Sequence, residues 1–152
     1  MGHGVDNEQR AALTARRAEL TEQHLKPRAT RPPSTARGVH HVAMISSDVG
    51  RTILFYDGVL CFPLIEMFEN RDYEGSTHFF FDIGHGNALA YFDLPGLDLQ
   101  PYMEVLGGHH HLAISISRPQ WEAARARLQA AGVECAHVDD SSLYFRGPDG
   151  ER

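Results

Sequence analysis

GVHHVAMI at residues 38–45 returns as GHHHLAIS at residues 108–115, with His41 and His111 at the same place. Each segment is a short apolar run with β-branched residues, which is typical of a strand. A stretch with helical character follows each segment after the same interval. The sequence therefore predicts a duplicated strand–helix unit, with one site built where the two halves meet.

Both halves continue from the strand to a helix and then to further strands. The helix of the first half, at 48–60, begins after Asp48, a suitable N-cap, and that of the second, at 118–131, begins at Pro119 and ends at Gly132. The expected strands lie at 39–46, 62–68, 76–83, 87–92, 109–117, 133–138 and 142–146. The predicted fold class is α+β: two βαβββ modules, 38–93 and 107–152, form a cupped mixed sheet around a cavity, and the second module lacks its last strand.

The first 37 residues differ in composition from the rest of the chain. They contain seven Lys/Arg and four Asp/Glu, whereas the remainder contains seven Lys/Arg and sixteen Asp/Glu. Residues 7–26 are rich in helix formers, and three prolines follow before Gly38. We expect 1–37 to be a basic helical arm with a proline-rich linker, either docked on a protein surface or frayed. Residues 38–152 are expected to form one domain.

The composition argues against several classes of function. An acidic domain is a poor nucleic-acid binder, and the basic arm is too short and too mixed in charge to reverse this. No apolar run approaches the roughly 20 residues of a membrane helix, and the N-terminus lacks the apolar stretch of a signal peptide, so a cytoplasmic location is expected. Cys61 and Cys135 lie in apolar contexts in different halves, which favours buried free thiols over a disulfide.

Strand alternation separates the histidines of the two repeated segments. His41 shares a face with Ala43, and His111 shares a face with Ala113 and Ser115. The opposite faces are bulkier and aliphatic, as expected of a side packed on helices. Two histidines that face a cavity at equivalent positions of a repeat favour a metal site over two unrelated core residues. Loop, edge or supporting positions are expected for His40, His109 and His110.

Two local motifs add to the repeat. Residues 55–62, FYDGVLCF, are similar to an FYxxxLGF segment in which Cys61 replaces the usual glycine, and residues 143–150, LYFRGPDG, look like a hairpin before a final strand. With the repeated βαβββ unit, these motifs resemble the vicinal oxygen chelate superfamily of glyoxalases, bleomycin-resistance proteins and extradiol dioxygenases. The resemblance covers 38–152 and implies a glyoxalase-like domain with a site shared by the two modules.

The resemblance also implies a set of metal ligands. It selects His41 and His111, the same pair that strand alternation selects. It implies a third ligand, a glutamate two residues beyond Arg152, so we expect the natural chain to continue; Glu151 lies too early to replace it. The fourth ligand of glyoxalase I falls on Ala90, which cannot bind metal. A three-ligand site for one divalent ion, Fe, Mn, Ni or Zn, is therefore expected.

Two further side chains are candidates for catalytic proton transfer. Tyr144 lies one hairpin before the expected glutamate, and His78 lies on the third strand among phenylalanines. Such groups move protons on a substrate whose adjacent oxygens a metal ion polarises. The strands also carry aromatic residues that indicate an apolar cavity, although half of them must face the helices: Phe79, Phe81, Tyr91 and Phe92. A small aromatic or apolar substrate is therefore predicted.

Three functions remain open on the sequence alone. The leading one is a metal-dependent enzyme of the extradiol-dioxygenase kind, acting on a small molecule chelated through adjacent oxygens. The alternative is a metal-free small-molecule-binding protein like those that confer bleomycin resistance, which has no need of His41 and His111. A thiol transferase like the fosfomycin-resistance proteins ranks last, because no lysine follows Gly38 to bind an anionic substrate. A homodimer is expected.

Overall fold

The chain forms two compact units, 1–38 and 39–152, in a computed structural model that describes residues 6–137 and 141–152. Each unit has its own secondary structure. The first contains one long helix and a short turn, and the second contains the remaining helices and all the strands.

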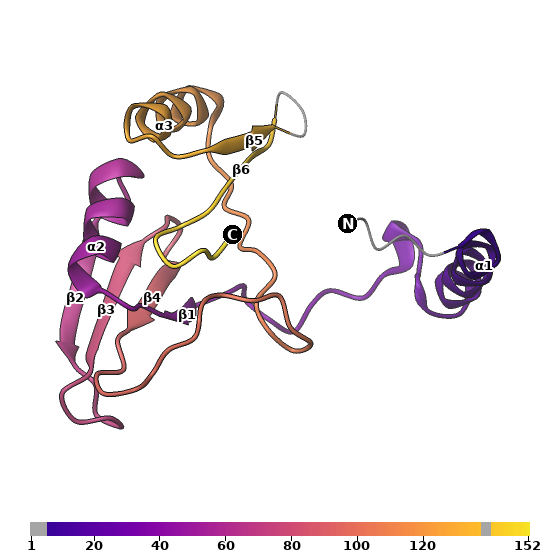
Figure 1. The fold of residues 1–152 in the computed structure, drawn as a ribbon. Coiled ribbons are helices and arrows are strands. Elements are labelled where there is room, and N and C mark those ends of the chain that lie inside the picture. The colour runs from indigo at the N-terminus through magenta and orange to yellow at the C-terminus, as the bar shows by residue number, and fades with distance from the viewer. Residues whose placement is uncertain (1–5, 138–140) are drawn as a thin grey trace. The chain divides into compact units, whose positions relative to one another are not determined.

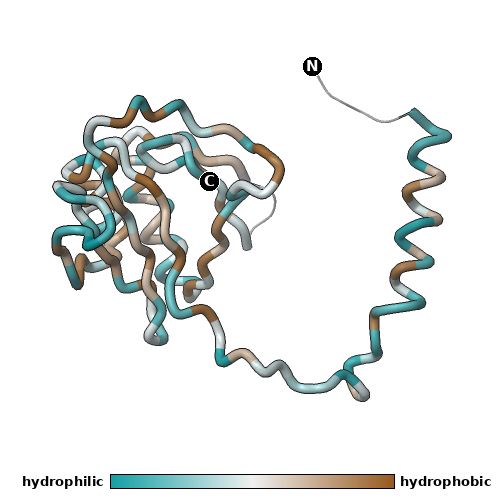
Figure 2. Tube along the Cα trace, turned by 90° about the horizontal axis from the view of Figure 1, so that it is seen from below, coloured by the Kyte–Doolittle hydropathy of each residue, from teal (hydrophilic) through white to brown (hydrophobic). Residues whose placement is uncertain are grey.

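The first unit consists of helix α1 (Asn7–His24) and the 3₁₀ turn η1 (Arg28–Thr30). A capping box begins α1: the Asp6 carboxylate accepts from Gln9 N at 2.8 Å, and the Gln9 side chain accepts from Asp6 N at 3.3 Å. No residue of α1 is buried, and Figure 2 shows a mostly hydrophilic helix with isolated apolar positions. The expected helix is therefore present, and its docking stays a prediction.

The second unit is built on a four-stranded mixed sheet (Figure 1). Its strands, in the spatial order β1-β4-β3-β2, are β1 (His41–Ile45), β4 (Ala88–Phe92), β3 (Thr77–Asp82) and β2 (Leu64–Glu69). β1 pairs in parallel with β4, where His41 lies opposite Ala88, and the other pairs are antiparallel. The sheet of the first βαβββ module is thereby confirmed.

The helix of the first module covers one face of this sheet (Figure 1). It begins as α2 (Val49–Ile53) and continues into a π-helical stretch, η2 (Leu54–Val59). Asp48 caps it as predicted, by accepting a hydrogen bond from Arg51 N at 2.8 Å. The sequence predicted one regular α-helix here, whereas the structure has a π-helical stretch with a wider turn in its second half.

The core lies between this helix and the covered face of the sheet. Alternate residues of β3 and β4 point into it and are at most 1% exposed: Phe79, Phe81, Leu89 and Tyr91. Tyr56 from η2 and Leu128 from the second module join the same cluster. The two modules therefore share one core. Full burial of each such side chain contributes on the order of 1.5–3 kcal/mol.

The second module contains one helix and a two-stranded hairpin. Their bounds are α3 (Arg118–Ala130), β5 (Cys135–His137) and β6 (Leu143–Phe145), with β5 and β6 antiparallel. α3 begins at a capping box of Ser117 and Gln120 and buries one face, formed by Trp121, Ala124 and Leu128. These elements match the expected ones, apart from Val138, which lies outside the described residues.

The strand expected at 109–117 does not form within the described residues. The segment keeps the expected alternation, because Leu112 is half-buried against the core whereas His111 is exposed. One ladder-type hydrogen bond is present, from Leu112 N to Arg152 O at 2.8 Å. A strand needs a hydrogen-bonded neighbour along its whole length, and here the described residues offer one only at Leu112.

Both cysteines are free thiols, in agreement with the sequence. Cys135 is half-buried, and burial raises the pKa of its thiol above the ordinary value. Cys61, however, is exposed and not buried as expected, and its φ of 59° lies in the left-handed region. Within residues 6–137 and 141–152, no helix is long and apolar enough to cross a membrane.

Candidate functional site

His41 lies on the face of the sheet opposite the helix, here called the open face. Along β1 the exposed residues are His41, Ala43 and Ile45, whereas Val42 and Met44 pack against the core. This is the division that strand alternation predicted. The histidine lies opposite Ala88 of β4, and its ring is 5.9 Å from that of Phe80.

His78 of β3 lies on the same open face within a group of aromatic rings. The His78 ring centroid is 4.3 Å from Phe80, 4.6 Å from Phe92 and 5.2 Å from Phe68. Burial, and next the charge of nearby His41, lower the pKa of His78 below its ordinary value. Its Nε2 is shielded from solvent and has no hydrogen-bond partner among the described residues. The structure therefore brings His41 and His78 together beside an apolar wall.

The sequence named four aromatic residues for an apolar cavity and expected half of them to face the helices; three of them do. Phe79, Phe81 and Tyr91 point into the core, so of the four expected residues only Phe92 lies on the open face. The reason is the two-residue period of the strand: Phe80 and Phe92 share the face of His78, while their neighbours face the helix. Alternation counted from His78 would have identified Phe80.

His111 lies beside Tyr144 in the second module. Their ring centroids are 6.4 Å apart, and Tyr144 is 37% exposed on β6, opposite Ala136. The four predicted site residues thus form two pairs, His41 with His78 and His111 with Tyr144. In the part of the chain that the structure describes, no hydrogen bond, ion pair or ring contact joins one pair to the other.

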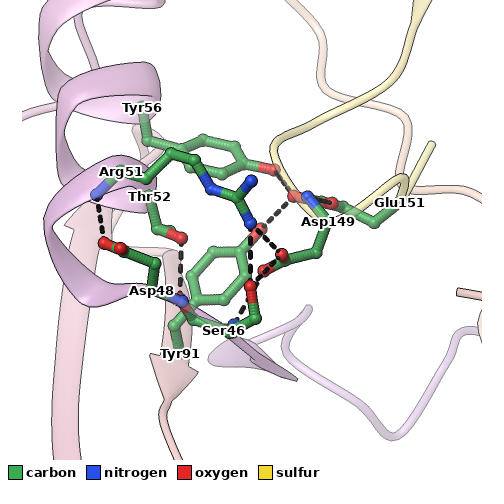
Figure 3. A network of polar contacts seen from close by, with 9 residues as sticks. Ser46, Asp48, Arg51, Thr52, Tyr56, Tyr91, Asp149 and Glu151 are labelled. Carbon is green, nitrogen blue, oxygen red and sulfur yellow. Dashed lines mark hydrogen bonds and ion pairs between the residues drawn. The ribbon is translucent and has the colours of Figure 1, made fainter. Parts of the chain in front are cut away.

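The side chain of Glu151 accepts hydrogen bonds that the sequence did not predict (Figure 3). Its side chain is buried, and its Oε1 accepts hydrogen bonds from Tyr56 Oη at 2.9 Å and Tyr91 Oη at 3.2 Å. Burial, together with the Glu151 charge, raises the pKa of Tyr56 above its ordinary value, and burial is also the main cause of the raised pKa of Tyr91. These contacts hold the Glu151 carboxylate toward the core, and its unsuitability as a metal ligand stays a prediction.

The turn before Glu151 fits closely around its carboxylate. A Cβ added at Gly147 would lie 2.1 Å from Glu151 Oε1, so only glycine leaves room for the buried acid. Asp149 N donates to Glu151 Oε2 at 2.9 Å and Gly147 N donates to Glu151 O at 2.7 Å. The glycine of the turn therefore has a packing role, because the side chain folds back over it.

Asp149 ties the same turn to the first module. Its Oδ2 accepts from Ser47 N at 2.9 Å, and its Oδ1 accepts from Ser47 Oγ and from Arg51 at 2.5 Å each. Ser47 lies two residues after the end of β1, and Arg51 belongs to α2. With the Glu151 contacts, these bonds form a junction of residues 147–152 against both the helix and the sheet of the first module (Figure 3).

The imidazole nitrogens of the two predicted ligands are atoms of a type that binds divalent metal ions. Neither His41 Nε2 nor His111 Nε2 takes part in a hydrogen bond within the described residues, and imidazole nitrogen is a good ligand for late divalent ions. Two imidazoles are an incomplete set: across residues 6–137 and 141–152, no three His, Cys, Asp or Glu side chains gather to hold a metal. The hydrogen bond from Leu112 N to Arg152 O gives Arg152 a place beside His111 like that of Ala88 beside His41.

An α+β domain of two related modules, each with a histidine at the matching position of its first segment, defines a protein of the vicinal oxygen chelate class. A profile of the Glyoxalase/Bleomycin resistance protein/Dioxygenase superfamily matches residues 38–152, and the chain belongs to this family. The resemblance found in the sequence is thereby confirmed.

Individual relatives are distant. The metallothiol transferase FosB of Lysinibacillus sphaericus is 24% identical over 131 residues, which cover 78% of this chain and 80% of FosB. A glyoxylase/bleomycin resistance protein/dioxygenase domain from Frankia is 20% identical with a TM-score of 0.66, over 77% of this chain and 94% of that one. FosX from Listeria monocytogenes, complexed with Mn(II) and sulfate, is 21% identical with a TM-score of 0.54, over 77% and 88%. At these identities the structures establish the fold alone.

Proposed function

We propose that this chain is a divalent-metal-dependent enzyme that acts on a small aromatic or apolar substrate chelated through two adjacent oxygens. The observation that carries the proposal is the pair His41 and His111, placed at equivalent positions of the two modules with both Nε2 atoms free of hydrogen bonds among the described residues. The third ligand proposed is a carboxylate two residues past Arg152. In the register of the first module this position corresponds to Ala90, on the open face.

The bound ion would supply Lewis acidity toward the two adjacent substrate oxygens. The chain's own residues would provide the rest. Phe80 and Phe92 form an apolar surface for the body of the substrate, and His78, whose ring contacts both, is proposed to accept or return a substrate proton. Tyr144, beside His111, is proposed as the second proton-transfer group.

Ring-cleaving chemistry of the extradiol-dioxygenase kind is the reaction we favour. A face built from Phe68, Phe80 and Phe92 suits an aromatic substrate better than a phosphonate or phosphate. The similarity to FosB raises thiol transfer as another reaction of the family. Arg146, the cation nearest in sequence to Tyr144, donates to Gly150 O at 2.6 Å, so this guanidinium is already engaged within the turn.

A metal-free binding protein is the second candidate. The observation in its favour is that the described residues contain no group of three metal ligands. The metal content of the purified protein discriminates between the two functions, because a sequestering protein binds its ligand by shape and apolar contact alone.

We also propose that the protein is a homodimer. The segment that links the modules exposes several large apolar side chains, which a second copy of the chain would cover: Leu97, Leu99, Met103, Val105 and Leu106. Sedimentation equilibrium tests this proposal, and a monomeric mass at micromolar concentration would contradict it.

Elemental analysis of tag-free protein, purified without added metal, tests the proposed function. We expect about one Fe, Mn, Ni or Zn ion per chain in the wild type and none in the His41→Ala and His111→Ala variants, with the fold unchanged because both side chains are exposed. Full metal occupancy in either variant would show that the ligands are assigned wrongly. A wild type that holds no metal and takes up none from anaerobic Fe(II) or Mn(II) would leave the binding protein.

A further inference from the structure

The repeat extends to a side-chain contact that the sequence did not predict. His40 Nδ1 lies 2.8 Å from His41 Nδ1, and His110 Nδ1 lies 2.7 Å from His111 Nδ1. The ring centroids are 5.1 and 5.0 Å apart, with interplanar angles of 77° and 73°. Each proposed ligand is thus held by the histidine before it, in the same edge-to-face geometry in both modules.

A contact between two Nδ1 atoms is a hydrogen bond only if one of them carries the hydrogen and the other does not. A neutral imidazole has one N–H donor and one bare nitrogen acceptor, so one ring of each pair must donate through Nδ1 and the other must accept. The ring that donates through Nδ1 has its lone pair on Nε2. A metal ion binds the bare nitrogen of a neutral imidazole, so only the donating ring can present Nε2 as a ligand.

In the second module a carboxylate favours one of the two arrangements. Glu104 Oε2 lies 3.8 Å from His110 Nε2, and the other oxygen of Glu104 accepts from Arg152 at 2.8 Å. The negative charge favours the hydrogen on His110 Nε2. His110 Nδ1 is then the acceptor and His111 Nδ1 the donor, which leaves His111 Nε2 bare. Glu104 thus determines which nitrogen of His110 carries the hydrogen, and His110 in turn determines this for His111.

We propose that His40 and His110 are positioning residues that each accept a hydrogen bond from the histidine after them and thereby hold its Nε2 ready for a metal ion. Glu104 reinforces this arrangement in the second module, and no carboxylate lies within ion-pair distance of His40 among the described residues. The inference rests on the proposed function, since it takes His41 and His111 as the ligands. It assigns a role to a side chain of the linking segment, Glu104, outside both modules.

The arrangement of hydrogens is measured directly in the metal-free protein. Long-range ¹H–¹⁵N correlation spectra at about pH 8, above the usual histidine pKa of about 6.5, distinguish Nδ1–H from Nε2–H rings. We expect Nδ1–H for His41 and His111, and Nε2–H for His40 and His110. The opposite assignment for His41 and His111 overturns the proposal. Glu104→Gln is expected to reduce the Nδ1–H form of His111 and to leave that of His41 unchanged.

Zn(II) titration by calorimetry supplies the second measurement, because imidazole binds Zn(II) well. We expect His110→Ala to weaken Zn(II) binding by about 10- to 100-fold and His111→Ala to abolish it. His110→Asn, whose amide oxygen can replace the Nδ1 acceptor, should restore most of the affinity. His24→Ala on the exposed helix α1 is the matched control and should change nothing.

The outcomes separate the two proposals. If His110→Ala binds Zn(II) as the wild type does, the positioning role is wrong while the ligand assignment stands. If His110→Ala abolishes binding and His110→Asn does not restore it, His110 is itself a ligand and the positioning role is again wrong. If the wild type binds neither Zn(II) nor, without oxygen, Fe(II) or Mn(II), the proposed function fails, and the positioning role fails with it.

Discussion

The two modules present the same histidine-bearing segment in different surroundings. In the first module, residues 41–45 form β1 and pair with β4 along their whole length. In the second, residues 111–115 form no strand and make a single ladder bond, from Leu112 N to Arg152 O. Both segments keep the same alternation of buried and exposed residues. The difference teaches that alternation specifies which side chains face the core, whereas the strand itself depends on a hydrogen-bonded partner.

A second difference lies in how each module contributes to the shared core. Phe79 and Phe81 of the first module are fully buried, whereas Phe145 of the second is only partly buried against the same cluster. Leu128 of α3 is also fully buried, so the second module reaches the centre of the core through its helix, whereas Phe145 of its hairpin lies at the margin. Substitutions that affect one module at a time test this division.

The largest effect is expected from removal of a central aromatic ring. Phe81→Ala should lower the free energy of unfolding by about 3–5 kcal/mol, because the cavity forms where no solvent reaches. Phe145→Ala is the matched change in the second module and should cost about half as much, since its ring already contacts water. Urea denaturation followed by circular dichroism measures both. Equal losses would contradict the division into centre and margin.

The second-largest loss of stability is expected from substitutions at the junction between the modules. Glu151→Ala leaves the hydroxyls of Tyr56 and Tyr91 without their acceptor and should cost about 2–3 kcal/mol. Glu151→Gln keeps an acceptor oxygen but loses the charge, so it should cost about 1 kcal/mol. The same denaturation experiment distinguishes the two. A Glu151→Ala variant as stable as the wild type would show that the hydroxyls find other partners.

The pH dependence of stability should show the same junction. The folded-state pKa values of Tyr56 and Tyr91 are raised, so the folded state favours the protonated hydroxyls. Their contribution is present in full below the pKa of an unfolded tyrosine, about 10, and is lost as the pH rises above it toward the raised values. Denaturation between pH 8 and about 11 should show falling stability. A double Tyr56→Phe, Tyr91→Phe variant should show a shallower fall.

The smallest effect concerns Cys61, where the first module departs from its family motif. The left-handed conformation, with φ at 59°, costs a residue with a side chain about 1–2 kcal/mol, and glycine adopts it freely. Cys61→Gly should therefore stabilise the protein by about 0.5–1 kcal/mol after the greater flexibility of unfolded glycine is subtracted. A rise in the thermal midpoint checks this. Gly132, also at positive φ, is a matched site where Gly132→Ala should destabilise.

Most of the fold was predictable from local pattern. Alternation predicts the strands of the first module. Gly132 predicts the end of α3. The segment at 109–117 was predicted as a strand and is not one, because pairing is a long-range property. The π stretch after Ile53 has no local signature in the residues that form it.

The candidate site was predictable in part. His41 and His111 followed from the repeat, and their exposed placement follows from alternation. The role of Glu151 was not predictable, because its partners lie 95 and 60 residues away on other elements. Among the open-face aromatics Phe80 was missed within a run of three phenylalanines, although alternation counted from His78 identifies it, and the pairing of His78 with Phe92 agrees.

The buried carboxylate at the junction also has a consequence for the order in which the protein is made. Tyr56 and Tyr91 leave the ribosome before Glu151, which follows Tyr91 by 60 residues. At roughly 5–20 residues per second, the nascent first module exists for several seconds before its acceptor is synthesised. During that interval both hydroxyls must stay hydrated, so the aromatic layer around them cannot close completely. Translation speed over residues 92–151 therefore sets how long an unfinished core is open to chaperones and to neighbouring chains.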